Sequence, residues 1–308
     1  CTWEEAIENI DIGGPSMIRS AAKNHEDVSV LVDPNQYEEF IEKLISKSID
    51  NSYRTELALK AFQHTTNYDA SISNWISKEK KISNDLFIDQ YPLIRELRYG
   101  ENPHQEAKWY GLENIGWNAA KQIQGKALSY NNLLDLESAL ATIIEFGYDN
   151  KSSLNNSNSS NAAVILKHNN PCGAAIDESL SNAFKKALDC DSISAFGGIV
   201  AFNKSVDSET AKLLSNIFLE CVVAPSFSEQ ALNILSNKSN LRLLELDKSM
   251  ILSNYKGSLK SIMGGLLVQE FDNKTINSKE WVTVTDKKPT DLQLKDLKFS
   301  WQICKHVK

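Results

Sequence analysis

The sequence predicts an α/β protein made of two successive regions. Short apolar runs that are typical of buried strands alternate with stretches in which apolar residues recur at helical spacing, and this alternation is the pattern of α/β folds. A polar stretch at 77–85 interrupts the pattern and indicates a boundary. We therefore expect two domains, 1–89 and 90–308.

The composition excludes several classes of protein before any motif is considered. The 308 residues include 33 basic and 40 acidic side chains, for a net charge of −7, and 42% are hydrophobic. This mixture is not that of collagen, a coiled coil or a disordered chain. Its acidity argues against a protein that coats nucleic acid by charge alone, and no apolar run approaches the roughly 18 residues of a membrane span. We expect neither nucleic acid nor a membrane as partner.

The cysteines and the chain ends indicate where the protein works and how much of it is present. The five cysteines are odd in number and scattered, which is typical of a reducing cytosol rather than a disulfide framework. The chain begins with Cys1, and it stops at Lys308 within a pattern of helical spacing that starts after Thr290. We therefore expect a fragment of a longer cytoplasmic protein, with processing or trimming of the ends as the alternative.

The first region is predicted to contain a turn, a helix, a strand and a long helical stretch. The turn at 11–15 combines two glycines with a proline suited to the first turn of a helix. The run 28–32 predicts a short buried strand. Asp33 can cap the next helix, with Gln36 placed for a capping box, and helical periodicity continues through 37–80.

The second region alternates strand and helix more regularly. A helix is predicted at 131–146, and a surface loop at 152–161, where nine of ten residues are Ser or Asn. Further helices are predicted to start near Asp207, Ser228 and Thr290. Strands are predicted at 162–166, 199–202, 221–224, 241–246, 265–269 and 281–285.

The sharpest candidate site is the run from Lys167 to Gly173, which follows the predicted strand 162–166 and precedes a predicted helix. His168 can move protons near neutral pH, and the adjacent Lys167 can polarise a carbonyl or hold a developing oxyanion. The N-terminus of a helix would add unpaired N–H groups and a dipole that favours negative charge. From the pattern alone, the alternative is a solvated His–Lys pair at the end of a strand.

Other segments carry weaker patterns. The loop 98–105 combines an arginine, whose fork suits phosphate, with an aromatic ring and backbone-setting Gly and Pro. The turn at 11–14, followed by Lys23, offers backbone N–H groups to a phosphate, although its spacing fits neither a dinucleotide fingerprint nor a Walker loop. Gly197 at the entrance of one strand permits close approach of a ligand, and Glu220 precedes another strand. An ordinary loop, turn or strand end is the alternative in each case.

A zinc-dependent deaminase is the nearest metal-based alternative. In that pattern, His-x-Glu is paired with Pro-Cys-x-x-Cys. Here Asn170 replaces the glutamate and Ala175 replaces the second cysteine, so the run offers at most two ligands, His168 and Cys172. A catalytic zinc needs three protein ligands, and the sequence therefore predicts no metal site of this type.

Taken together, eight segments resemble the bifunctional purine-biosynthesis family that combines AICAR transformylase (phosphoribosylaminoimidazolecarboxamide formyltransferase) with IMP cyclohydrolase. They occur in the family's order and cover nearly the whole chain. The segments are IDIGG with AAKNH, LRYGENPHQ, SYNNLLD, LKHNNPCG, SAFGGIVAFN, VVAPSF, GGLLVQ and WQICKHVK. The resemblance implies that 1–89 is the C-terminal part of a methylglyoxal synthase-like cyclohydrolase domain with a helical linker. It implies that 90–308 is part of a transformylase domain, cytidine deaminase-like in fold but without zinc.

The resemblance also implies roles in formyl transfer from 10-formyltetrahydrofolate. His168 would be the proton acceptor, and Lys167 its electrostatic partner. The residues that match contacts to the substrate nucleotide are Arg98, Tyr99, Gly197 and Glu220. Other family members carry Asp at the position of Glu220.

For the cyclohydrolase reaction, the resemblance implies that Lys23 donates and accepts the proton. Asp11, Ile12 and Gly13 would form part of the nucleotide loop. The family's N-terminal phosphate-binding segment and its contacts beyond Lys308 are absent from this sequence, so we expect the chain alone to be inactive. The full-length protein is expected to be a homodimer with nucleotide and reduced-folate substrates. A zinc-type nucleoside or base deaminase and a non-catalytic nucleotide-binding module remain as alternatives.

Overall fold

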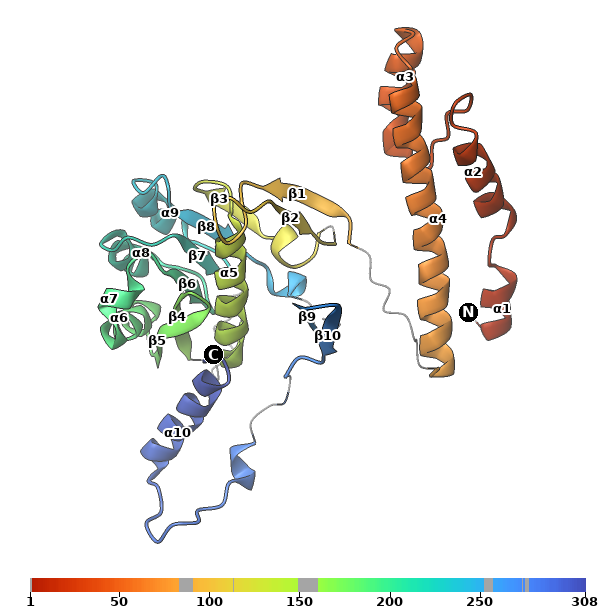
Figure 1. Ribbon diagram of the computed structural model, residues 1–308. Helices are drawn as coiled ribbons and strands as arrows, with labels where there is room; N and C mark the ends of the chain where they lie inside the picture. Colours follow the sequence, from red (N-terminus) through yellow and green to blue (C-terminus); the bar gives the residue numbers. More distant parts are fainter. Residues whose placement is uncertain are drawn as a thin grey trace. The chain divides into compact units, whose positions relative to one another are not determined.

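The chain divides into two compact units, 1–90 and 91–308, which are described separately (Figure 1). The computed structural model describes residues 2–82, 91–112, 114–148, 160–251, 257–272, 274 and 277–308. The expected loop 152–161 lies outside the described residues except for its last two positions. The division falls next to the expected boundary, while the assignment of each unit to a domain stays a prediction.

The described part of the first unit is helical. Its elements are α1 (Trp3–Glu8), α2 (Gly13–Lys23), the 3-10 turn Pro34–Gln36, α3 (Tyr37–Ile45) and α4 (Asn51–Lys80). Asp33 and Gln36 form the predicted capping box, and Asp50 caps α4 by accepting from the Tyr53 amide at 2.8 Å. Local capping chemistry therefore sets where the 3-10 turn and α4 begin.

The small core of this unit lies between α2 and α4. Ala22 packs against Ala58 and Ala61, and Val30 and Val32 lie against the same cluster. The predicted strand 28–32 is wrong, because this segment forms no strand. The described residues of the unit supply no strand partner, and an unpaired strand leaves its N–H and C=O groups without hydrogen bonds. Val30 and Val32 are only partly buried and Val28 is exposed, so the apolar pattern overestimated burial as well as pairing.

The second unit is built on a six-stranded sheet with the strand order β3-β8-β7-β6-β4-β5. Strands β6, β7 and β8 are parallel to one another, whereas β4 runs antiparallel to both β6 and β5, and β3 antiparallel to β8. In sheet order the strands are β3 (Lys121–Gln124), β8 (Arg242–Glu245), β7 (Cys221–Ala224), β6 (Ile199–Phe202), β4 (Asn161–Lys167) and β5 (Asn170–Asp177).

Helices cover both faces of this sheet (Figure 1). One core cluster joins the sheet to α6 (Leu180–Cys190), α8 (Ser208–Ser215) and α9 (Glu229–Leu235). A second cluster joins the other face to α5 (Tyr130–Ile143). Burial on both faces explains why β4, β6 and β7 are continuous apolar runs rather than alternating ones. The predicted strands at 162–166, 199–202 and 221–224, and the helices near Asp207 and Ser228, are confirmed.

The remaining elements of the second unit are two hairpins and several short helices. The hairpins are β1 (Leu93–Leu97) with β2 (Ala107–Tyr110), and β9 (Ser258–Ile262) with β10 (Gly265–Gln269). The helices are α7 (Ser192–Ala195), α10 (Asp291–Cys304) and 3-10 turns at Gly116–Asn118, Ile144–Phe146, Lys248–Met250 and Ser278–Glu280.

Three sequence predictions are wrong in this unit. The segment after Lys167 is strand β5, not a helix, so no helix dipole acts there. The run 281–285 forms no strand; Trp281 instead packs edge-on against Trp301 of α10, with ring centroids 6.1 Å apart. Helix α10, capped by Thr290 as predicted, ends at Cys304 before the last residue.

Candidate active site

The candidate residues Lys167 and His168 lie at a tight β-hairpin turn. Lys167 of β4 pairs with Asn170 of β5, which leaves His168 and Asn169 as the two turn residues. Both have positive φ angles, 55° and 62°. Two consecutive left-handed residues form the hairpin turn whose twist matches the strands, and His and Asn tolerate this conformation better than most residues. The backbone therefore holds the exposed His168 side chain at the tip of a paired hairpin.

Helix α5 holds this turn from one side. The Asn169 amide donates to Asp135 Oδ1 at 2.6 Å, and the Ser138 hydroxyl donates to Asn169 Oδ1 at 3.3 Å. The Asn170 side chain donates to the His168 carbonyl at 3.3 Å. Left-handed residues cost free energy of order 1–3 kcal/mol each and persist where the surroundings fix them. These contacts supply that restraint.

The sheet topology brings two other candidate segments to the same end as the turn. Leu166 pairs with Ile199, Ile199 with Cys221, and Cys221 with Arg242. Because β4 runs antiparallel to β6, its C-terminal end lies beside the N-terminal ends of β6, β7 and β8. Gly197 lies two residues before β6 and Glu220 directly before β7, so they share this end of the sheet with Lys167.

Hydrogen bonds connect these segments. Lys167 Nζ donates to the Phe196 carbonyl at 2.7 Å, the Gly197 amide donates to the Phe218 carbonyl at 2.8 Å, and the Glu220 amide to the Gly198 carbonyl at 3.0 Å. Gly197 has a φ angle of 75°, a conformation that favours glycine. The Lys167 ammonium is thus held beside the glycine turn.

Glu220 forms an ion pair with Arg242 at this end. The Arg242 Nη1 to Glu220 Oε2 distance is 2.6 Å. Cys221 follows Glu220 and pairs with Arg242 across the strands, and burial raises the pKa of its thiol to about 12 despite the opposing effect of Arg242. A thiol with such a pKa stays protonated at neutral pH, so Cys221 offers no thiolate nucleophile to the site.

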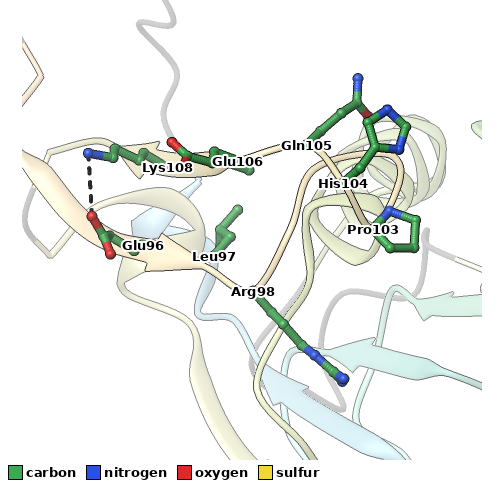
Figure 2. Close-up of a pocket in the computed structure, with 9 residues that line it drawn as sticks. Glu96, Leu97, Arg98, Pro103, His104, Gln105, Glu106 and Lys108 are labelled. Carbon is green, nitrogen blue, oxygen red and sulfur yellow. Dashed lines mark ion pairs between the residues drawn. The ribbon is translucent and has the colours of Figure 1, made fainter.

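Arg98 and Tyr99 lie on the loop that joins β1 to β2. The Gly100 amide donates to the Gln105 carbonyl at 2.7 Å, which closes the loop, and the guanidinium carbon of Arg98 lies 5.5 Å from the Tyr99 ring centroid. A pocket of about 280 Å³ is lined by residues of this hairpin. Figure 2 shows the Arg98 side chain extending away from Glu96 and Lys108, which form an ion pair at 3.3 Å.

Helix α5 connects this loop with the hairpin turn. At its first turn, the Asn131 side chain donates to the Glu101 carbonyl at 3.3 Å. One turn later, Asp135 accepts from the Asn169 amide. Residues four apart lie on the same helix face, so one face of α5 contacts both candidate segments.

The candidates of the first unit are not brought together. Asp11 accepts from the Gly14 amide at 3.1 Å, and its own amide donates to the Tyr68 hydroxyl of α4 at 2.7 Å. Asp11, Ile12 and Gly13 therefore lie at the start of α2, whereas Lys23 is its last residue. At 1.5 Å per residue, the two ends of this helix are about 15 Å apart.

Sequence reasoning assigned no role to Asp135, Ser138 or Arg242, which hold the candidate site. Asp135 stood within a recognised segment, SYNNLLD, and Arg242 within a predicted strand. A charged residue within a buried apolar strand is a signal that a partner lies nearby.

The described part of the chain brings together no cluster of three or more His, Cys, Asp or Glu side chains able to hold a metal ion. None of its helices is both long and apolar enough to cross a membrane.

A family model and the most similar sequences point to the same protein family. The model of the AICARFT/IMPCHase bienzyme family matches residues 21–308. The chain is 62% identical over 308 residues to a bifunctional purine biosynthesis protein PurH of Prochlorococcus marinus strain MIT 9515, covering 100% of this chain and 59% of that protein. It is 63% identical over 306 residues to the PurH of Prochlorococcus marinus subsp. pastoris strain CCMP1986, covering 99% of this chain and 59% of that protein.

Among solved structures, the chain is similar to Acinetobacter baumannii RibD, form 2, at 15% identity with a TM-score of 0.24. That match covers 37% of this chain and 34% of RibD, and it is too weak to support an argument. The sequence matches are strong, and the chain spans 59% of the length of the curated relatives given above. The chain belongs to the AICARFT/IMPCHase bienzyme family.

Proposed function

We propose that the protein to which this chain belongs transfers a formyl group from 10-formyltetrahydrofolate to 5-aminoimidazole-4-carboxamide ribonucleotide and then closes the ring to form IMP. The observation that carries the proposal is the end of the six-stranded sheet, where Lys167, His168, Gly197 and Glu220 lie on adjacent strand ends. Family membership supports purine biosynthesis as the setting. The two units are then the cyclohydrolase part, methylglyoxal synthase-like, and the transformylase part, cytidine deaminase-like.

In formyl transfer, the substrate amine attacks the formyl carbon and loses a proton. The amine is a poor nucleophile because its lone pair is conjugated with the imidazole ring, and a base that removes the proton as the C–N bond forms lowers the barrier. His168 is that base. The carbonyl oxygen gains negative charge in the same step, and the Lys167 ammonium stabilises it. Collapse of this intermediate breaks the bond to the folate nitrogen, which leaves with a proton as tetrahydrofolate.

The remaining candidates hold the nucleotide. Arg98 offers two-pronged hydrogen bonds to an anionic group, and Tyr99 an aromatic face. Gly197 permits close approach of the ligand to the backbone, and Glu220 accepts a hydrogen bond from it. All four lie on segments that strand pairing or helix α5 fixes in the second unit.

Ring closure needs orientation and proton transfer, because the attacking carboxamide nitrogen and the formyl carbon belong to one molecule. Lys23 moves the proton, and Asp11, Ile12 and Gly13 contact the nucleotide. These residues lie at opposite ends of α2, so this site needs groups that the first unit alone does not gather. We therefore expect the 308-residue chain by itself to lack both activities, and robust turnover of either substrate by the purified chain would contradict this.

Replacement of Lys167 and His168 by Ala in the full-length protein tests the transformylase assignment. Formyl transfer is expected to fall by about a thousandfold, the combined effect of losing a general base and an electrostatic group, while cyclohydrolase activity measured on the formylated nucleotide stays intact. Lys186→Ala is a matched control, because Lys186 pairs with Asp177 at the opposite end of β5. Undiminished formyl transfer in the double variant would refute the assignment.

We further propose that the full-length protein is a cytoplasmic homodimer. The second unit exposes apolar side chains on the β9–β10 hairpin, including Met263 and Leu267, and exposed apolar surface of this kind is typical of interfaces. Size-exclusion chromatography with light scattering at micromolar concentration should give the dimer mass. A monomer mass would refute it.

A further inference from the structure

Arg242 is the one charged residue among the buried residues of the described chain. It is the first residue of β8, and its side chain is 11% exposed. Burying a charge is costly unless the charge is paired and hydrogen-bonded. The groups that pair with the buried guanidinium of Arg242 therefore indicate its role.

The guanidinium group is fixed by contacts from two directions. Its Nε donates to the Ala127 carbonyl at 3.2 Å, on the segment that leads into α5. Its Nη1 contacts Glu220 Oε2 at 2.6 Å and the Glu220 carbonyl at 3.5 Å. A planar fork anchored at one nitrogen can orient a carboxylate at another, which a flexible ammonium does less well.

The ion pair is asymmetric in its exposure. The Glu220 side chain is 39% exposed, whereas that of Arg242 is 11% exposed. Among the described residues, Arg242 is the only side chain that hydrogen-bonds to the Glu220 carboxylate, and it engages one of the two oxygens. The other oxygen keeps its full capacity to accept a hydrogen bond from a ligand at this end of the sheet.

We propose that Arg242 is a positioning residue of the nucleotide site. It pairs with Glu220 and fixes the orientation of its carboxylate, so that the second oxygen meets a hydrogen-bond donor of the nucleotide. The inference rests on the proposed function, in which Glu220 contacts the nucleotide. It adds a residue and a contact: Arg242 acts through Glu220 and does not touch the reacting atoms.

The experiment compares Arg242→Gln, Glu220→Gln and the double variant in the full-length protein, with steady-state formyl transfer as the readout. Each single variant is expected to raise KM for the nucleotide about tenfold, the scale of one charge-assisted hydrogen bond, with KM for 10-formyltetrahydrofolate unchanged. Because Arg242 acts only through Glu220, the double variant should be no worse than Glu220→Gln. An unchanged nucleotide KM in Arg242→Gln, or fully additive effects, would overturn the inference.

Two further variants separate positioning from folding. Lys186→Gln removes an ion pair of the same 2.6 Å length at the opposite end of β5 and should leave both KM values unchanged. If Arg242→Gln does not fold, Arg242→Lys retains the charge without the fork, and its nucleotide KM should still rise at least threefold; a wild-type value would contradict the inference. If the wild-type protein itself does not formylate the nucleotide, the proposed function fails, a result distinct from failure of the Arg242 role.

Discussion

The two units position their candidate residues in different ways. In the second unit, Lys167, Gly197 and Glu220 lie on strand ends that hydrogen bonds hold next to each other. In the first unit, Asp11 and Lys23 lie at opposite ends of one helix, whose buried contact with α4 consists of a few alanines. A sheet gathers residues that are distant in sequence, whereas a single helix spreads neighbouring residues along its length. The transformylase candidates are therefore preorganised within this chain, and the cyclohydrolase candidates are not.

Two glycines, one in each unit, test this contrast, and their replacement is expected to give the largest difference in the free energy of unfolding. A Cβ added at Gly173 of β5 would collide with the Ala187 carbonyl of α6, whereas one added at Gly13 meets no atom within 4 Å. Gly173→Ala should lower the free energy of unfolding by about 3 kcal/mol, and Gly13→Ala should leave it unchanged or raise it by up to about 1 kcal/mol. Urea denaturation measures both. Equal effects would contradict the contrast.

Two aspartates, one in each unit, give a second test of the contrast between the units. Asp135 Oδ1 accepts from the Asn169 amide, which lies 34 residues away in sequence, whereas Asp11 Oδ1 accepts from the Gly14 amide three residues away. Asp135→Ala should cost about 2 kcal/mol, because it releases a turn held in the left-handed region. Asp11→Ala should cost about 1 kcal/mol, the scale of a helix cap.

Hydrogen–deuterium exchange shows where each loss occurs. Asp135→Ala should increase exchange in β4 and β5, and Asp11→Ala only in the first turns of α2. A larger or more widespread effect from Asp11→Ala would reverse the ranking of the two units.

The smallest expected effect concerns His306, which lies just after the end of α10. Burial lowers the pKa of His306, and this outweighs the attraction of the Glu145 carboxylate, 3.3 Å away. The unfolded chain then binds the proton more readily than the folded one, so stability should decrease as pH falls below about 6.5, the ordinary His value. Urea midpoints at pH 7.5 and 5.5 should differ more for the wild type than for His306→Gln. The same pH dependence in both would refute this origin.

The fold of the second unit could largely be predicted, for a physical reason. Strands such as Ala162–Leu166 are buried on both faces, so they are continuous apolar runs bounded by polar segments. The hairpin at His168 could not be predicted, because the sequence Asn170–Asp177 mixes Pro, Gly and Ala. This segment is a strand because it pairs with β4. The segment 28–32 failed for the opposite reason: its residues favour a strand, but it pairs with none. Local patterns report burial, whereas pairing depends on segments far away in sequence.

The residues of the candidate site could be predicted from the sequence, but their arrangement in space could not. Motifs singled out Lys167, His168, Gly197 and Glu220. Their common location follows from the antiparallel placement of β4 beside β6, which no local pattern reveals. Arg242 and Asp135 were missed for the same reason, because their importance lies in partners 22 and 34 residues away.

The central claim is that the end of the sheet at His168 receives the nucleotide. Titration of the isotopically labelled 308-residue chain with 5-aminoimidazole-4-carboxamide ribonucleotide, followed by backbone amide NMR up to millimolar concentration, tests it most directly. Weak binding is expected, with shifts confined to the amides of Lys167 to Asn170, Gly197, Gly198 and Glu220 and to the loop 98–105. Shifts centred on Asp177 and Asn203 at the opposite end of the sheet, or no shifts at any concentration, would contradict it.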